Sequence, residues 1–378
     1  MSPQNESSAL LQQHRPTQAA TRRAILVIDS LVGGGAERSV LTIAGGLVQR
    51  GWMVDLISLY PPTSYPIPAG VRHVVLSDTD KVADKWLSER LRNWFDDAGS
   101  PQCNLFLVNL LHSSRVVKGA NLPLLAHYVI RNPLFEQQRR TRHIFVRFIT
   151  KCMTRKLYAG EHVIAISKGV ADDLVQGMTR QPASVSVIYN SFDIEGIRRL
   201  ASVPEPDAEI LAPFVICVGH FKRQKRQDIA LRAWAASGIK ADLVFLGGGS
   251  QRKKRKIEQL AQNLGVKERV HIIDWQSNVY SWLKASSLLL LTSDFEGFGR
   301  VIVEALAVGT PVVATDSPGG PKEILVGDLA RGLAPVGDEV GIAKCMSEIL
   351  AKPPNLADVD LGIFSLDSVL DEYERKAC

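Results

Sequence analysis

The stretch SLLLLTSDFEGFGRVIVEALAVGTPVVAT, residues 287–315, decides the fold that the sequence predicts. Its first six residues form a short apolar run that is typical of a buried strand, and residues 300–308 predict a helix closed by Gly309. Residues 310–315 form a second apolar run, so the stretch predicts a strand–helix–strand unit with parallel strands. Sheets built from such units bind ligands beyond the carboxyl ends of their strands, where loop 293–299 would lie.

Two glutamates lie on this unit, Glu296 in the loop and Glu304 just over one turn into the helix. The loop residues Gly297, Phe298 and Gly299 can bring backbone N–H groups to the helix N-terminus, which binds anions through its geometry and its dipole. Two carboxylates would repel a bare phosphate, but they accept hydrogen bonds from hydroxyl groups. A nucleotide sugar carries both hydroxyls and phosphates, and it is the ligand that this combination favours. A single glutamate in a helix, in contrast, is usually just a solvated side chain.

The length of the chain, 378 residues, is too great for one ordinary core and predicts two domains. We expect a disordered polar leader over residues 1–22, which lacks the apolar segment of a secretory signal. A first domain over 23–203 and a second over 204–360 should follow, with a Pro- and acid-rich linker near 203–207 between them. Residues 361–378 should form a C-terminal helix that packs back toward the first domain.

The predicted strands alternate with helices in both halves, which indicates an α/β fold with doubly wound parallel sheets. Two Rossmann-like domains of this kind would face each other across a cleft, and that cleft is the natural ligand site. The strands expected before the 287–315 stretch are 24–29, 53–59, 105–108, 126–130, 163–166, 185–188, 214–218, 241–246 and 270–273.

Further loops with polar or glycine residues follow strands in both halves. In the second half, four Lys/Arg lie within residues 222–226, where they could neutralise a diphosphate or simply be solvated, and Gly247–Gly249 follows the next strand. In the first half, Gly33–Gly35 opens a helix, but a dinucleotide motif would need glycine at position 38, where Arg38 stands. No GxxxxGK[ST] motif occurs, so nicotinamide chemistry and P-loop hydrolysis are both disfavoured.

The net charge of the chain indicates which classes of partner it could bind. The charge of +6 suits nucleic acid, an anionic membrane face or phosphorylated substrates. Nucleic acid ranks last, because the basic segments lack interleaved stacking residues and no nucleic-acid-binding module is recognisable.

The cysteines show neither CxxC nor metal-ligand spacing, which predicts a reduced, cytoplasmic protein without structural zinc or disulfides. They are Cys103, Cys152, Cys217, Cys345 and Cys378.

The segment 139–156 contains seven Lys/Arg and no acidic residue, with large apolar residues interleaved at helical spacing. One interpretation is an amphipathic helix that makes peripheral contact with an anionic membrane. The other is an ordinary helix with a buried apolar stripe and a solvated basic face. A second basic cluster, 252–256, predicts a solvated helix start.

With these motifs assembled, the chain resembles the retaining glycosyltransferases of the GT-B fold that carry an E-x7-E motif, family four. The resemblance runs from about Ile25 to Leu333. It is strongest from Glu296 to Glu304 and in the GTPVVATD and PGGPKEIL segments that follow. Weaker matches are GGAER at Gly34–Arg38, AISKGVADDL from Ala165 and IYNSFD from Ile188.

The resemblance implies roles for the matching residues. Glu304 would hold the ribose hydroxyls of a nucleotide-sugar donor, Glu296 would contact the donor sugar, and Lys225 would bind the diphosphate. The amides of residues 297–299 would bind sugar or phosphate oxygens. The backbone of Gly34 and Gly35 would approach the donor phosphates, and the loop with Gly248 allows a close approach to the ligand. His112 would lie near the transferred sugar.

One position departs from the family pattern. Where the family has an arginine after the first strand of the second domain, this chain has His220, and we expect Arg223 to substitute for it.

No Asp-x-Asp motif lies beside the phosphate loops, so cationic side chains and amides are expected to replace a metal, and no cofactor is expected.

The resemblance also implies a glycan or lipid-linked acceptor, in lipopolysaccharide, capsule or exopolysaccharide synthesis at the cytoplasmic membrane face. The donor would be a hexose or N-acetylhexosamine linked to a nucleotide, with uridine the commonest base in the family. A sugar-nucleotide epimerase, a phosphorylase and a non-catalytic nucleotide-sugar-binding partner stay as alternatives.

Overall fold

The computed structural model describes residues 22–377, apart from Gly33, Pro62, Ser64, Lys81, Arg142 and residues 205–212. The expected leader, except Arg22, lies outside the described residues, as do Gly33 of the glycine loop and most of the expected linker.

The first domain is built on a seven-stranded parallel sheet with the order β3-β2-β1-β4-β5-β6-β7. Its strands are β1 (Arg23–Ile28), β2 (Met53–Ser58), β3 (Val71–Val75), β4 (Leu105–Asn109), β5 (Ala126–Ile130), β6 (His162–Ala165) and β7 (Ser184–Val187). The helices between them are α1 (Gly35–Gln49), α2 (Asp84–Asp97), α3 (Leu111–Ala120), α4 (Leu134–Arg139), α5 (Ile144–Tyr158) and α6 (Lys168–Gly177).

The second domain repeats the plan with six parallel strands in the order β10-β9-β8-β11-β12-β13. Its strands are β8 (Phe214–Val218), β9 (Asp242–Leu246), β10 (Val270–Ile273), β11 (Leu288–Leu291), β12 (Val312–Thr315) and β13 (Leu333–Ala334). Its α-helices are α9 (Gln227–Ser237), α10 (Gln251–Asn263), α11 (Tyr280–Ala285), α12 (Arg300–Ala307), α13 (Pro321–Ile324) and α14 (Glu339–Ala351).

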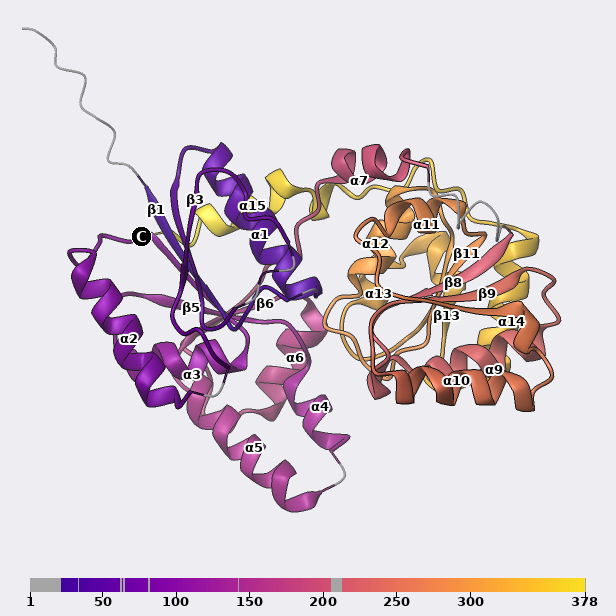
Figure 1. The fold of residues 1–378 in the computed structure, drawn as a ribbon, viewed down its shortest axis with the longest axis horizontal. Coiled ribbons are helices and arrows are strands. Elements are labelled where there is room, and N and C mark those ends of the chain that lie inside the picture. Colours follow the sequence, from indigo (N-terminus) through magenta and orange to yellow (C-terminus); the bar gives the residue numbers. More distant parts are fainter. Residues whose placement is uncertain are drawn as a thin grey trace, which may run out of the picture.

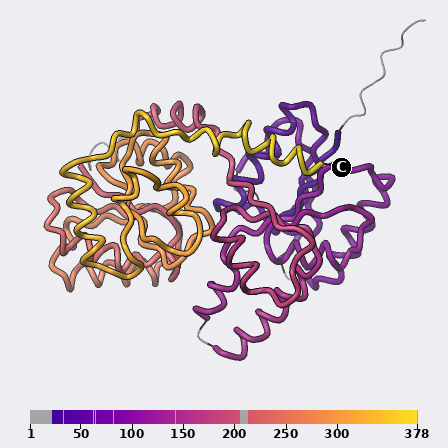
Figure 2. Tube along the Cα trace, turned by 180° about the vertical axis from the view of Figure 1, so that it is seen from behind, coloured from indigo at the N-terminus to yellow at the C-terminus, as the bar shows by residue number. Residues whose placement is uncertain are grey.

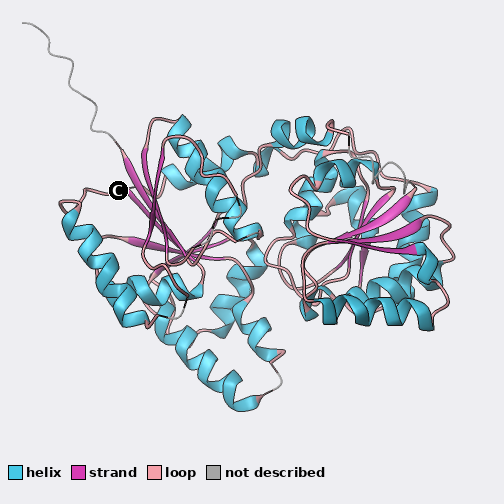
Figure 3. Cartoon of the chain, in the orientation of Figure 1, coloured by secondary structure: helices cyan, strands magenta, loops and turns pink. Residues whose placement is uncertain are grey.

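Both sheets are doubly wound, with helices on both faces (Figures 1 and 3). The strand order reverses between β1 and β4 in the first sheet and between β8 and β11 in the second. The predicted fold class, two Rossmann-like α/β domains, is therefore confirmed. Strand β11 consists of four buried leucines, as its apolar run predicted, and it pairs with β8 and β12 at the centre of its sheet. These switch points aim the loops after β1, β8 and β11 at the space between the domains.

The chain crosses between the domains twice (Figure 2). The predicted boundary at 203 assigned α7 (Ile194–Ala201) to the first domain, but α7 packs against α11 and α12 of the second, so the first crossing precedes it. The chain returns to the first domain near η4 (Gly362–Phe364), where the backbone N–H of Phe192 donates to the carbonyl of Phe364 at 2.9 Å. Helix α15 (Leu366–Glu374) then packs on α1 of the first domain, and Trp52 Nε1 donates to Glu374 Oε1 at 2.8 Å.

The basic segment 139–156 does not form one continuous helix, because α4 ends at Arg139 and α5 begins at Ile144. The interpretation of a buried apolar stripe is wrong, because Phe145 is 73% exposed and Phe148 is 65% exposed. The expectation for 252–256 fits α10, whose Ile257 and Ala261 are buried while most of its cations stay exposed. None of the helices in the described part of the chain combines the length and apolar composition that crossing a membrane requires.

Candidate functional site

A cleft of about 450 Å³ lies between the two domains and is lined by residues of both. Its size is within the range of about 300–1,000 Å³ that is usual for small-molecule sites. The first domain contributes the start of α1 and the ends of β4 and β5, and the second contributes the loops after β8, β9 and β11. Ten of the predicted site residues line this cleft: Gly34, Gly35, His220, Lys225, Gly248, Glu296, Gly297, Phe298, Gly299 and Glu304.

Two predicted site residues do not line the cleft. His112 lies in the first turn of α3, where its Nε2 atom is 2.9 Å from Asp84 Oδ1 and 3.4 Å from the Tyr60 hydroxyl. Arg223 lies exposed in the short turn after β8. The cleft wall near that turn is instead formed by His220, Lys222 and Lys225, so the expected substitution by Arg223 does not fit this arrangement.

The loop between β11 and α12 is shaped by close approaches of backbone that need glycine. A Cβ atom on Gly297 would lie 1.9 Å from the carbonyl oxygen of Arg131 in the first domain. Ser167 of the first domain also donates from Oγ to the Gly297 carbonyl at 2.7 Å. Gly299 has a φ of 89° and forms the N-cap of α12. Only glycine readily permits both features, so the loop is pressed against the first domain while its backbone lines the cleft.

Glu296 is held by partners from its own domain. Its Oε1 atom accepts hydrogen bonds from Lys225 Nζ at 2.6 Å and from Ser293 Oγ at 2.5 Å. The residue is only 6% exposed, so its charge is matched at close range rather than by bulk water. Lys225, which was expected at a diphosphate, therefore pairs with Glu296 here. Because an ammonium group has three N–H donors, it can keep this pair and still donate to a phosphate oxygen.

Glu304, which is 4% exposed, is held by a cation from the opposite domain. Arg38 Nη1, from α1, lies 3.2 Å from Glu304 Oε1 and also donates to the Tyr280 hydroxyl at 3.2 Å. Arg300, one turn before Glu304, approaches the same oxygen at 3.5 Å. Burial opposes the charge on Arg38, but the neighbouring Glu304 raises the pKa of its guanidinium above the usual value. This buried pair joins the two domains across the cleft.

Arg38 is a functional candidate that sequence reasoning missed, since it was named as a non-glycine in a failed dinucleotide motif and as part of the GGAER match, without a role of its own. Arg131, directly after β5, lines the cleft although its side chain is largely buried. Arg131 donates to Asn109 Oδ1 at 2.8 Å and to Asn190 Oδ1 at 3.0 Å, and burial lowers the pKa of its guanidinium. The signal that could have identified Arg38 is its place in the first turn of α1, directly after the glycine loop.

Glu37 is a third acid of the cleft, next to Arg38 at the start of α1. Burial raises the pKa of its carboxyl, while its own backbone N–H, Arg131 and Lys222 act in the opposite direction. Within the described residues Glu37 forms no ion pair, in contrast to Glu296 and Glu304.

Neither metal-binding clusters nor disulfides occur among the residues that the structure describes. Those residues contain no group of three or more His, Cys, Asp or Glu that could hold a metal ion. Cys103, Cys152, Cys217 and Cys345 are free thiols. The expectations of metal-independent chemistry and of a reduced compartment stay predictions.

Two protein families match the chain, one in each domain. Residues 33–195 match Glycosyltransferase Family 4, and residues 209–360 match Glycosyl transferases group 1.

Relatives with described activities match over different lengths. The chain is 30% identical over 319 residues to the N-acetylgalactosamine-N,N'-diacetylbacillosaminyl-diphospho-undecaprenol 4-alpha-N-acetylgalactosaminyltransferase of Campylobacter jejuni, which covers 82% of this chain and 84% of that protein. It is 32% identical over 182 residues to a lipopolysaccharide 1,6-galactosyltransferase of Salmonella typhimurium, which covers 46% of this chain and 47% of that enzyme.

Among solved structures, Anabaena Alr3699/HepE in complex with UDP and glucose superposes with a TM-score of 0.75 at 20% identity, covering 94% of this chain and 98% of that one. The lipopolysaccharide glycosyltransferase WaaG superposes with a TM-score of 0.59 at 16% identity, covering 93% of this chain and 95% of WaaG. At these identities the likeness concerns the fold.

Proposed function

The chain belongs to the glycosyltransferases of group 1 and family 4, and from this premise we propose that it transfers a hexose or N-acetylhexosamine from a nucleotide sugar, with retention of the anomeric configuration. The acceptor is a hydroxyl group of a glycan or of a lipid-linked sugar. The observation that carries the proposal is the meeting of Glu296, Glu304 and Lys225 in one cleft lined by both domains.

The donor fits the cleft by its two kinds of oxygen. Both cations that contact Glu304 approach Oε1, so Oε2 can accept hydrogen bonds from the ribose hydroxyls. Both protein donors to Glu296 also reach Oε1, which leaves its other oxygen for the sugar hydroxyls. Lys225, Lys222 and the amides of residues 297–299 then face the diphosphate. A uridine base is the proposed choice, because the similarly folded Anabaena HepE binds UDP and UDP-glucose.

The proposed reaction breaks the bond between the anomeric carbon and the donor diphosphate. The acceptor oxygen forms the new bond to that carbon on the same face, and a donor phosphate oxygen takes the proton of the acceptor hydroxyl. The nucleoside diphosphate leaves with this proton. Positive charge on Lys225 and the helix N-terminal amides stabilise the negative charge that develops on the leaving group.

No metal enters this proposal, because Lys225 and the backbone amides face the region where the diphosphate would lie. Transfer should therefore survive treatment with a chelator. Complete loss of transfer that magnesium restores would contradict this part of the proposal.

The acceptor is proposed to be lipid-linked or part of a surface polysaccharide. Two relatives act on such acceptors by name, one on a diphospho-undecaprenol glycan and one on lipopolysaccharide. The proposed setting is therefore lipopolysaccharide, capsule or exopolysaccharide synthesis, with the enzyme in the cytoplasm and in peripheral contact with the membrane face.

A thermal-shift screen against a panel of nucleotide sugars tests the donor directly. A donor at 100 times its dissociation constant should stabilise the protein by about 2.7 kcal/mol. Product analysis with labelled donor then distinguishes transfer to an acceptor from epimerisation or phosphorolysis. If no nucleotide sugar or nucleoside diphosphate shifts the melting temperature, the proposed donor site is wrong.

A further inference from the structure

One face of α5 leaves a row of large apolar side chains in water. Counted from Phe145, the residues Phe148, Ile149 and Cys152 come three, four and seven positions later, so all four lie on one side of the helix. Ile144 is 82% exposed, and Met153 extends the same surface. We call these six residues the α5 face. Such a contiguous exposed apolar surface marks an interaction site.

The opposite side of α5 is anchored, so the exposure is not the result of a loosely packed helix. Thr154, Leu157 and Tyr158 are buried. Thr154 Oγ1 accepts a hydrogen bond from Gln138 of α4 at 2.8 Å, and Arg155 Nε donates to the Gly177 carbonyl of α6 at 2.8 Å. These contacts fix how the helix is rotated and hold the α5 face outward. Figures 1 and 2 show α4 and α5 projecting from the rest of the first domain.

The segment that carries the α5 face is strongly basic. The segment 139–156 contains seven Lys/Arg and no acidic residue, and Arg147 and Lys156 are exposed on α5 itself. A helix that combines bulky apolar residues with such a charge binds at the boundary between headgroups and acyl chains of an anionic bilayer. Two copies of this chain that met face to face would bring their cations together, which disfavours self-association.

We propose that the α5 face docks on an anionic lipid bilayer, with its aromatic residues entering the headgroup layer and its cations pairing with lipid phosphates. Helix α5 has 15 residues, so it would lie along the surface rather than span the bilayer. This inference rests on the proposed function in one respect, namely that a lipid-linked acceptor would lie in the same bilayer.

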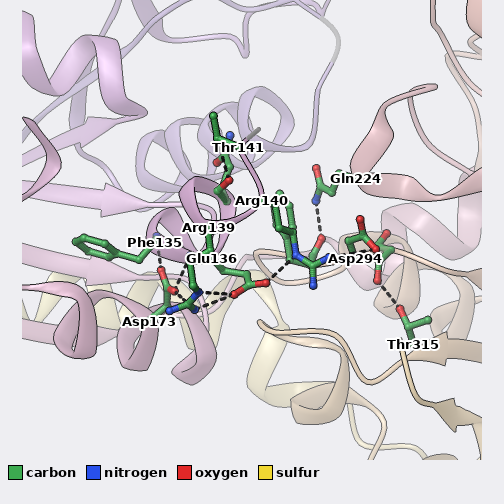
Figure 4. Close-up of polar contacts among 12 residues, drawn as sticks. Phe135, Glu136, Arg139, Arg140, Thr141, Asp173, Gln224, Asp294 and Thr315 are labelled. Carbon is green, nitrogen blue, oxygen red and sulfur yellow. Dashed lines mark hydrogen bonds and ion pairs between the residues drawn. The ribbon is translucent and has the colours of Figure 1, made fainter. Parts of the chain in front are cut away.

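Helix α4 packs against α5 and is also joined to the loop between β11 and α12, and Figure 4 shows the polar contacts of α4 and of that loop. Asp173 caps α4 by accepting hydrogen bonds from the backbone N–H groups of Phe135 at 2.7 Å and Glu136 at 2.9 Å. At the other end of α4, Arg140 pairs with Glu136 at 2.7 Å and, across the domains, with the buried Asp294 at 3.3 Å.

Asp294 precedes Glu296 by two residues, and Gln224 holds the intervening residue by donating to the Phe295 carbonyl at 2.6 Å. Helix α5 is therefore connected to the β11–α12 loop through α4, by the Gln138–Thr154 hydrogen bond at one end and the Arg140–Asp294 pair at the other. A bilayer bound at α5 would lie at a set position relative to the cleft, which suits delivery of a membrane-anchored acceptor.

Cosedimentation with vesicles tests the proposal without donor or acceptor, so its failure would leave the proposed transferase function standing. The protein should pellet with vesicles of phosphatidylglycerol and phosphatidylethanolamine, much less with phosphatidylcholine alone, and less as salt is raised. Either Phe145→Ser with Phe148→Ser, or Arg147→Gln with Lys151→Gln, should weaken partitioning by at least about 10-fold.

The matched control is Arg255→Gln with Lys256→Gln, which removes two exposed cations from α10, the basic helix whose apolar residues are buried. It should retain partitioning within about 2-fold, because diffuse charge is screened while inserted side chains are not. Equal loss in the α10 and α5 charge variants, or no preference for anionic lipid, would overturn the proposal. Concentration-dependent dimers in light scattering that disappear in the phenylalanine variant would assign the face to a second copy.

A label at Cys152 supplies a second measurement that leaves the phenylalanines and cations of α5 in place. Cys152 is exposed on the α5 face, and Cys103, Cys345 and Cys378 would be replaced by serine. An environment-sensitive fluorophore there should shift to shorter wavelength with anionic vesicles. An unchanged spectrum on pelleted protein would show that another surface binds.

Discussion

The two glutamates of the cleft are held by cations from different parts of the molecule. Glu296 pairs with Lys225 and Ser293, both in its own domain, whereas Glu304 pairs with Arg38 of the opposite domain. The first arrangement persists when the domains move apart, because all its members move together. The second exists only while the domains are close. We infer that Glu296 and Lys225 form a prepared half-site, and that the partners of Glu304 change with domain closure.

Loss of Lys225 should have the largest effect, because it removes both the partner of Glu296 and the cation that we propose at the diphosphate. Lys225→Ala should lower turnover by at least about 100-fold, or roughly 2.7 kcal/mol. Steady-state transfer assays measure this, with Arg223→Ala as the control, since Arg223 is an exposed cation of the same turn that does not line the cleft. Near-normal transfer by purified Lys225→Ala would refute its role.

Removal of the Glu304 carboxylate should also be costly, because it abolishes the proposed ribose contact and leaves Arg38 and Arg300 without their shared partner. Glu304→Ala should lower turnover by about 100-fold. A titration of the protein with UDP should show weaker binding as well. Unchanged UDP affinity would mean that the ribose is not held by this residue.

Removal of Arg38 tests whether the cross-domain pair acts through closure. Arg38→Gln should lower turnover by about 10-fold, or roughly 1.4 kcal/mol, while UDP affinity changes much less, because the second domain supplies most of the proposed donor contacts. Isothermal titration and transfer assays on the same preparation give the two numbers. A parallel loss of UDP affinity and turnover would show instead that Arg38 contacts the donor.

The smallest effect concerns Glu37, the acid without an ion pair among the described residues. Since burial raises the pKa of this carboxyl in the folded state, the native protein binds its proton more tightly than the unfolded chain does. Its contribution to stability is therefore present at low pH and is lost as the pH rises through the raised pKa. Glu37→Gln should flatten that decline. Chemical denaturation at a series of pH values, from below the usual glutamate pKa to above the raised pKa of Glu37, measures this decline in stability. A steeper decline in the variant would contradict the raised pKa of Glu37.

The fold was largely predictable because its strongest signals are local. The apolar run of β11, the closing Gly309 and the apolar run of β12 lie within one strand–helix–strand unit, and the structure reproduces it. Strand β3 was missed because Val71–Val75 is an edge strand with half-exposed side chains, which leaves no clear apolar run. Strand β13 was missed because it has only two residues.

The site was predictable in part. Comparison with known proteins confirms the resemblance at the level of glycosyltransferase domains, and ten predicted residues line one cleft. Retention and the individual roles of these residues stay predictions. Arg223 was chosen as the substitute for the family arginine that His220 replaces, and His112 from a loose match in the loop after a strand. Neither residue is among those that line the cleft.

The sequence by itself determined the two parallel sheets, the loops at their carboxyl ends and the acids and cations on those loops, because short-range periodicity and glycine positions specify them. The tertiary structure alone decided that Arg38 reaches Glu304, that Arg140 reaches Asp294, and that the α5 face stays in water. The two ion pairs join residues more than a hundred positions apart, so they depend on how the domains are placed. Helical spacing places the apolar residues of α5 on one side of the helix, but it does not specify whether that side packs against the domain or faces water.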